Sequence, residues 1–140
     1  MDLVADASVI VKWFLHEEGR AKALRLRDDF VAQDVQLHVP EVLPFEVLNA
    51  LRFSSRFDEA ACLQAQVVLD GYGFRRHALV GEFARRAVHV SYARGLPIHD
   101  ASYMALAKLL GLKVITADDA LARAVGRDAI SIEDYVPLGP

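Results

Sequence analysis

Short apolar runs alternate with longer amphipathic segments along this chain, and this alternation restricts the possible fold more than any other feature. The runs have the length and composition of buried strands, whereas the segments between them repeat apolar residues at helical spacing. The predicted strands cover residues 3–5, 36–39, 113–116 and 130–132, and the predicted helices cover residues 8–15, 20–33, 42–53, 58–69, 79–92, 100–110 and 118–126. Strands that alternate with helices favour an α/β fold with a mainly parallel sheet.

The ends of several predicted helices carry residues that are typical of helix starts and breaks. Ser8 and Asp58 are the expected N-caps of their helices, and Pro44 fits a first helical turn. Gly71 interrupts the chain after the fourth helix. The stretch "RGLPIHD" predicts a loop, and Asp100 at its end is expected to open the next helix.

Length and composition fit one domain over residues 1–140. Apolar residues make up 54% of the chain and charged residues 25%, as in ordinary globular proteins. No apolar stretch reaches the roughly 18 residues of a membrane span, and the start lacks the pattern of a secretory signal. We therefore expect a cytoplasmic protein. A lone cysteine, Cys62, excludes cysteine-rich zinc sites, and the five histidines lack the spacing of a helical zinc motif.

Two aspartates directly follow predicted strands. Asp6 comes after the strand over residues 3–5, and Asp118 comes after the strand of "KVIT". Parallel α/β sheets bind ligands beyond the carboxyl ends of their strands, so both side chains should lie at the same edge. A simpler interpretation stays open for each, because an aspartate before a helix also caps free backbone N–H groups.

Two further acids, Glu46 and Asp100, are candidates for the same edge. Asp100 stands where a helix is expected to begin, and the capping interpretation stays open for it as well. Glu46 borders an apolar stripe on its helix, and its simpler interpretation is an exposed acid of an amphipathic helix. Asn49 shares a face with Glu46 and is a candidate hydrogen-bond partner. Four carboxylates in one place repel each other unless cations bind. Oxygen ligands suit Mg²⁺ or Mn²⁺, which activate water and stabilise the leaving oxygen in phosphoryl transfer.

The formal net charge of −3 argues at first against a nucleic-acid partner. If four of the acids belong to one metal site, the rest of the chain carries a formal net charge of +1. Bound divalent ions would offset the charge of the pocket itself. Net charge therefore does not exclude RNA.

Four segments of the chain resemble the motif regions of the PIN domain family, and more narrowly of its VapC-like toxin ribonucleases. They are "LVADASVIVKW", "PEVLPFEVLNAL", "LPIHDASYMALA" and "VITADDALA", in the family's order and spacing. The resemblance covers nearly the whole chain. It implies a three-layer α/β/α sandwich with a mainly parallel sheet, and a metal-dependent ribonuclease that uses Mg²⁺ or Mn²⁺.

The resemblance also assigns the site. Asp6, Glu46, Asp100 and Asp118 match the family's four acids in order, as metal ligands and catalytic residues. Asp119 is an alternative to Asp118. The resemblance further implies a homodimer and a small antitoxin protein that blocks the acidic groove.

Other residues near these motifs have a structural interpretation that is favoured over a functional one. Ser8 and Thr116 are expected to be a helix cap and a strand end, and His99 an exposed loop residue, although each could act in the site. Two basic pairs are expected on solvated helix faces or against RNA, namely Arg75 with Arg76 and Arg85 with Arg86. Trp13 belongs either to the core or to a subunit interface.

Other functions are weighed against these residues. A phosphatase of the haloacid dehalogenase class needs a second aspartate two residues after Asp6, where this chain has Ser8. A receiver domain needs a lysine after a late strand, where "VITADD" has aspartate. A stand-alone RNA-processing PIN nuclease and a non-catalytic PIN-like binding module both remain open, and a metal-dependent nuclease assay separates the latter from an enzyme.

Overall fold

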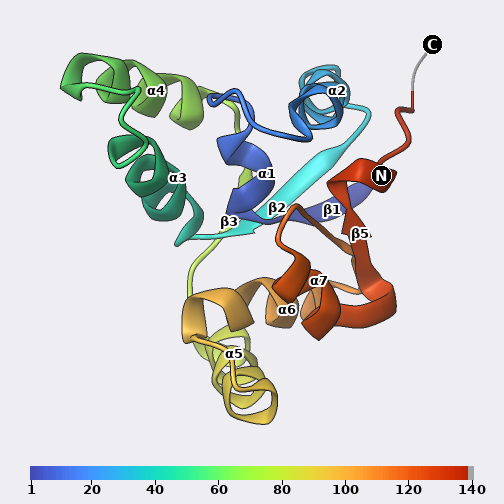
Figure 1. The fold of residues 1–140 in the computed structure, drawn as a ribbon. Helices are drawn as coiled ribbons and strands as arrows, with labels where there is room; N and C mark the ends of the chain where they lie inside the picture. The colour runs from blue at the N-terminus through green and yellow to red at the C-terminus, as the bar shows by residue number, and fades with distance from the viewer. Residues whose placement is uncertain (139–140) are drawn as a thin grey trace.

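Five parallel strands form the sheet at the centre of the computed structural model, which describes residues 1–138 (Figure 1). The strands are β1 (Asp2–Ala5), β2 (Gln36–Pro40), β3 (Arg75–His77), β4 (Val114–Thr116) and β5 (Ala129–Ser131), in the spatial order β3-β2-β1-β4-β5. Strand β1 is central, and its Val4 pairs with His38 on one side and with Val114 on the other. The predicted parallel sheet is therefore confirmed.

Helices cover both faces of the sheet. They are α1 (Ala7–Val11), α2 (Arg20–Val31), α3 (Leu43–Arg52), α4 (Glu59–Gly71), α5 (Gly81–Arg94), α6 (Ile98–Leu110) and α7 (Asp119–Val125). Figure 1 shows α1 to α4 on one side of the sheet and α5 to α7 on the other. Right-handed crossovers produce this arrangement, because the chain moves outward from β1 to β3 and then returns past β1 to β4 and β5. The result is the expected α/β/α sandwich.

The core is built from the inner faces of these layers. Helix α6 contributes most to it, since every residue from 101 to 107 is buried. Trp13 also lies in the core, where its ring packs edge-on against Tyr72 and near Phe30 and Phe74. Within residues 1–138, no helix has both the length and the apolar character needed to cross a membrane.

Two local predictions were wrong. Strand β3 was not expected, because Arg75 and Arg76 were placed on a helix face rather than in an edge strand. Helix α6 begins at Ile98, inside the stretch predicted as a loop. Pro97 occupies its N-cap position with a φ of −58°. A proline suits this position because its missing N–H would have no intrahelical partner there.

The chain changes direction at the boundary between β1 and β4. It leaves β1 toward one face of the sheet through α1, and leaves β4 toward the other face through α7. Helices diverge at such a boundary and leave a crevice beyond the carboxyl ends of the two strands. Asp6 follows β1 and Asp118 follows β4, so both stand at this crevice.

Candidate acidic site at the carboxyl edge of the sheet

Asp6 is buried at the junction of β1 and α1, with only 7% of its surface exposed. It occupies the N-cap position of α1 but makes no side-chain capping bond. Its Oδ2 instead accepts hydrogen bonds from Ser8 Oγ at 2.6 Å and from Thr116 Oγ1 at 2.9 Å. The prediction that Ser8 caps this helix was therefore wrong, and the helix-capping interpretation of Asp6 does not hold.

The two hydroxyl groups fix the orientation of the Asp6 carboxylate. Ser8 Oγ accepts the N–H of Ala117 at 2.9 Å, and Thr116 Oγ1 accepts the N–H of Asp118 at 2.9 Å. The two hydroxyl oxygens also lie 3.3 Å from each other, but Asp6 Oδ2 is the nearer acceptor for the proton of each. The other oxygen, Oδ1, has no side-chain partner among residues 1–138 and is available to a ligand.

Asp118 is the one acid of the four that does cap a helix. Its Oδ1 accepts the N–H groups of Ala120 at 2.9 Å and Leu121 at 3.2 Å, at the start of α7. The second oxygen is not used in this cap. Asp119 is exposed and lines a separate hollow with Lys12, on the side of Ser131 and Glu133. The structure therefore favours Asp118 over Asp119 as the neighbour of Asp6.

Glu46 lies in the first turn of α3 and is held by a tyrosine from the opposite layer. Tyr103, fully buried on α6, donates its hydroxyl to Glu46 Oε1 at 2.6 Å. The predicted partner, Asn49, is exposed and makes no hydrogen bond to Glu46. The sequence contained one signal for Tyr103, since it lies three residues after Asp100 and so shares its helix face.

Asp100 and His99 lie in the first turn of α6, facing Glu46. One ligand atom from each of Glu46, His99 and Asp100 lies within 4.8 Å of the others. His99 Nε2 is 3.5 Å from Asp100 Oδ1. His99 is exposed as predicted, but it belongs to a helix rather than a loop and is part of this group. Asp100 makes no capping bond, because Pro97 holds the N-cap position.

The charges of these acids affect one another. Burial raises the pKa of Asp6, and the negative charge of Asp118 raises it further, against the two hydroxyl hydrogen bonds. Burial also raises the pKa of Glu46, as do the charges of Asp6 and Asp100, while the Tyr103 hydrogen bond opposes the shift. Burial and the charges of Glu46 and Asp6 place the pKa of Tyr103 well above its ordinary value, so it stays a proton donor. The charges therefore link Asp118 to Asp6, and Asp6 and Asp100 to Glu46. Among residues 1–138, the group of possible ligands within 4.8 Å holds Glu46, His99 and Asp100 but not Asp6 or Asp118.

The donor set fits a hard divalent cation. Carboxylate oxygens dominate, His99 adds an imidazole at the rim, and no thiol is nearby. Mg²⁺ and Mn²⁺ prefer such oxygen ligands. Ionised carboxylates at short range in a partly buried place are also disfavoured until a cation binds, as the raised pKa values of Asp6 and Glu46 indicate.

The predicted basic pairs contribute little to this site. Arg85 and Arg86 both bind Glu82 on the exposed surface of α5. Arg76 lies on β3 and binds Asp70 at 3.3 Å. These are solvated ion pairs.

Comparison with known proteins identifies relatives across nearly the whole chain. The sequence model of the PIN domain matches residues 3–126. Ribonuclease VapC3 of Pyrobaculum aerophilum is 32% identical over 127 residues, which cover 87% of this chain and 93% of that protein.

Solved structures share the fold. The crystal structure of PAE2754 from Pyrobaculum aerophilum superposes with a TM-score of 0.71 at 23% identity, over 95% of this chain and 85% of that one. A toxin-antitoxin complex from Klebsiella pneumoniae superposes with a TM-score of 0.68 at 18% identity, over 93% of this chain and 97% of that one. At these identities the likeness shows the fold alone.

Proposed function

The chain belongs to the PIN domain family, and from this premise we propose that it is a divalent-metal-dependent endoribonuclease, the toxin of a toxin–antitoxin pair. The observation that carries this proposal is the group of Glu46, His99 and Asp100 within 4.8 Å of one another, beside Asp6 and Asp118 at the carboxyl ends of β1 and β4. The raised pKa values of Asp6 and Glu46 support it: burial is the main cause, and the charges of Asp118 on Asp6, and of Asp6 and Asp100 on Glu46, add to it. The 32% identity to a VapC ribonuclease supports RNA as the substrate.

In this proposal Asp6, Glu46, Asp100 and Asp118 hold Mg²⁺ or Mn²⁺ and are the catalytic residues. The bound ion supplies Lewis acidity, which lowers the pKa of water and stabilises charge on the phosphodiester. Asp6 offers Oδ1, since its other oxygen accepts two hydroxyl groups. Asp118 offers the oxygen that does not cap α7.

Three uncharged side chains keep the acids in place. Ser8 and Thr116 hold the Asp6 carboxylate, and Tyr103 holds Glu46 across the gap between α3 and α6. Each is a positioning residue, because it contacts a metal ligand and not the substrate. Fixed carboxylates lose little mobility when a cation binds, which favours an ordered site.

We also propose a homodimer and a small antitoxin protein as the partners of this chain. The fold shared with a toxin-antitoxin complex supports the antitoxin. The exposed apolar residues of α4, among them Leu63 and Val67, offer surface for protein contacts. An antitoxin encoded beside this chain should inhibit it in stoichiometric amounts and spare metal-independent nucleases.

The proposal is tested by RNA cleavage with matched variants. The purified protein should cut single-stranded RNA with Mg²⁺ or Mn²⁺ and should be inactive in EDTA. Asp6→Asn should abolish cleavage, whereas Asp119→Asn, an exposed neighbour outside the group, should leave it unchanged. Equal cleavage by the parent and Asp6→Asn would show that another site, or another nuclease, is responsible.

A further inference from the structure

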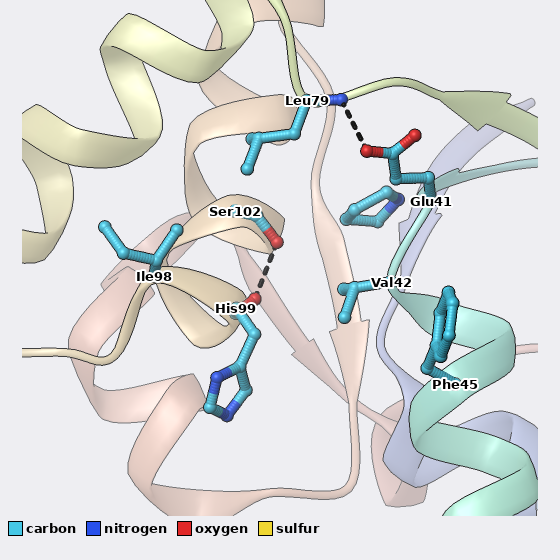
Figure 2. Close-up of a pocket in the computed structure, with 8 residues that line it drawn as sticks. Glu41, Val42, Phe45, Leu79, Ile98, His99 and Ser102 are labelled. Carbon is cyan, nitrogen blue, oxygen red and sulfur yellow. Dashed lines mark hydrogen bonds between the residues drawn. The ribbon is translucent and has the colours of Figure 1, made fainter.

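A hollow of about 460 Å³ lies between the start of α3 and the first turn of α6 (Figure 2). We call it the α3–α6 hollow. It is lined chiefly by Glu41, Val42, Phe45, Leu79, Ile98 and His99. Its volume falls within the range of pockets that bind small organic groups.

The α3–α6 hollow is continuous with the acidic site. His99 lines the hollow and also belongs to the group with Glu46 and Asp100. Phe45 directly precedes Glu46, and both residues line an adjoining surface depression together with His99. An RNA whose phosphodiester lies against the carboxylates would therefore place a neighbouring nucleotide beside this hollow.

The lining favours a base over a phosphate. Val42, Leu79 and Ile98 give the hollow mainly apolar walls, and its charged member is the carboxylate of Glu41. A phosphate would be repelled by Glu41, and within residues 1–138 the lining holds no lysine or arginine to pair with it. A flat, uncharged base would bury its faces against the apolar side chains.

Phe45 supplies an aromatic surface at the rim. It is 76% exposed although it lies on the helix that also carries Glu46. A phenylalanine this exposed contributes little to the core, so packing does not explain its place. Exposed aromatic rings beside a phosphate site are typical of single-stranded nucleic-acid binding, where bases stack on them.

Glu41 supplies a hydrogen-bond acceptor in a fixed position. Its Oε1 accepts the backbone N–H of Leu79 at 3.1 Å, which ties the carboxylate to the loop after β3 (Figure 2). A carboxylate accepts about four hydrogen bonds, so acceptor positions remain. Guanine, adenine and cytosine carry exocyclic amino groups that can donate to it. Uracil has no amino group, and its one ring N–H donor is flanked by two carbonyl oxygens that the carboxylate would repel.

We propose that the α3–α6 hollow binds one unpaired base of the RNA, adjacent to the phosphodiester that is cut. Phe45 stacks on this base, and Glu41 favours bases with an exocyclic amino group over uracil. This inference rests on the proposed ribonuclease function and explains how the enzyme would prefer certain bases beside the cut.

The experiment first maps the cleavage sites in a randomised single-stranded RNA. It then measures kcat/KM for one preferred oligonucleotide and for the same oligonucleotide with uracil at the selected position. Phe45→Ala should lower kcat/KM by about five- to a hundredfold, mainly through KM, because stacking is lost. Phe45→Leu should act in the same direction, since it keeps an apolar side chain but no aromatic face. Glu41→Gln should reduce the discrimination against uracil about threefold or more.

Phe53→Ala is the matched control. Phe53 is an exposed aromatic residue at the other end of α3 and does not line the hollow, so kcat/KM should stay within about twofold. Binding of RNA to Asp6→Asn, with and without Phe45→Ala, gives a second measurement that needs no cleavage. Thermal melting should show that all variants fold, because Glu41, Phe45 and Phe53 are exposed.

Two results would overturn the proposal while leaving the ribonuclease function intact. The first is a parent enzyme that cuts RNA with no base preference beside the cut, with Phe45→Ala and Glu41→Gln unchanged. The second is a pair of variants that cleave RNA normally but escape the antitoxin, which would assign the hollow to a protein side chain. A parent that cuts no RNA at all would instead refute the proposed function.

Discussion

Replacing Asp6 by asparagine should stabilise the metal-free protein. Burial and the charge of Asp118 raise the pKa of Asp6, so its ionised form costs stability at neutral pH. Asparagine has nearly the same shape, and its side-chain oxygen can still accept the hydroxyl groups of Ser8 and Thr116. Removal of an unfavourable buried charge is typically worth about 1 kcal/mol. A chain of 140 residues has an unfolding entropy of about 0.3 kcal/mol/K, so Tm should rise by about 3 °C.

The pH dependence follows from the direction of the shift. An acid whose folded pKa lies above its unfolded value binds protons more readily in the folded state. The free energy of unfolding of the parent should therefore increase as pH falls through the folded pKa toward the ordinary value of 3.8. Asp6→Asn lacks this contribution, so the difference in free energy of unfolding between Asp6→Asn and the parent should shrink over the same pH interval.

Bound metal should make the parent more stable than Asp6→Asn, the reverse of the order expected without metal. At about 100 times its dissociation constant, Mn²⁺ stabilises the folded parent by about 2.7 kcal/mol, or about 9 °C here. Asp6→Asn should gain much less. Calorimetry of both proteins in EDTA and in Mn²⁺ checks this, with Asp119→Asn expected to respond like the parent. Equal Mn²⁺ shifts for the parent and Asp6→Asn, or a clear loss of stability for Asp6→Asn in EDTA, would refute the reasoning.

Three further predictions use other contacts of the structure. Asp118→Ala should lower the free energy of unfolding by about 0.5–2 kcal/mol in thermal melts because the α7 cap is lost, whereas Asp118→Asn should keep the cap. Both variants should lose RNA cleavage. Tyr103→Phe should cost about 1.5 kcal/mol in urea unfolding at neutral pH, and this difference should narrow as Glu46 is protonated. Tyr135→Phe should cost about 1–3 kcal/mol, because it removes a hydroxyl that donates to buried Asp29, and thermal melts of Tyr92→Phe, an exposed counterpart, should be unchanged.

The layout of the fold could be predicted because it depends on local periodicity. Apolar runs gave β1, β2, β4 and β5, and capping chemistry placed Asp58 correctly at the start of α4, where it accepts the N–H of Ala61. Strand β3 could not be predicted this way, since its three residues, including Arg75 and Arg76, are mostly exposed and pair only along one edge. Such a strand is formed by its neighbour and not by its own apolar pattern.

The acids of the site could be proposed from the sequence, but their partners could not. The rule that parallel strands end at one edge placed Asp6 and Asp118 together. The contacts that hold these acids join distant segments, as with Thr116 on Asp6 and Tyr103 on Glu46. Tertiary packing alone decides which hydroxyl meets which carboxylate, so local spacing suggested Asn49 instead of Tyr103.

The most direct test of the central claim measures Mn²⁺ binding and RNA cleavage in the same titration. Mn²⁺ is titrated into protein from which metal has been removed, and electron paramagnetic resonance measures how much of it binds. A labelled single-stranded RNA in the same samples reports the rate of hydrolysis. If Asp6, Glu46, Asp100 and Asp118 hold the ion that supports cleavage, the rate should rise in proportion to bound Mn²⁺, and Asp6→Asn should show neither binding nor cleavage at the same concentrations. Cleavage without bound Mn²⁺, or parent-like binding and cleavage by Asp6→Asn, would contradict the account.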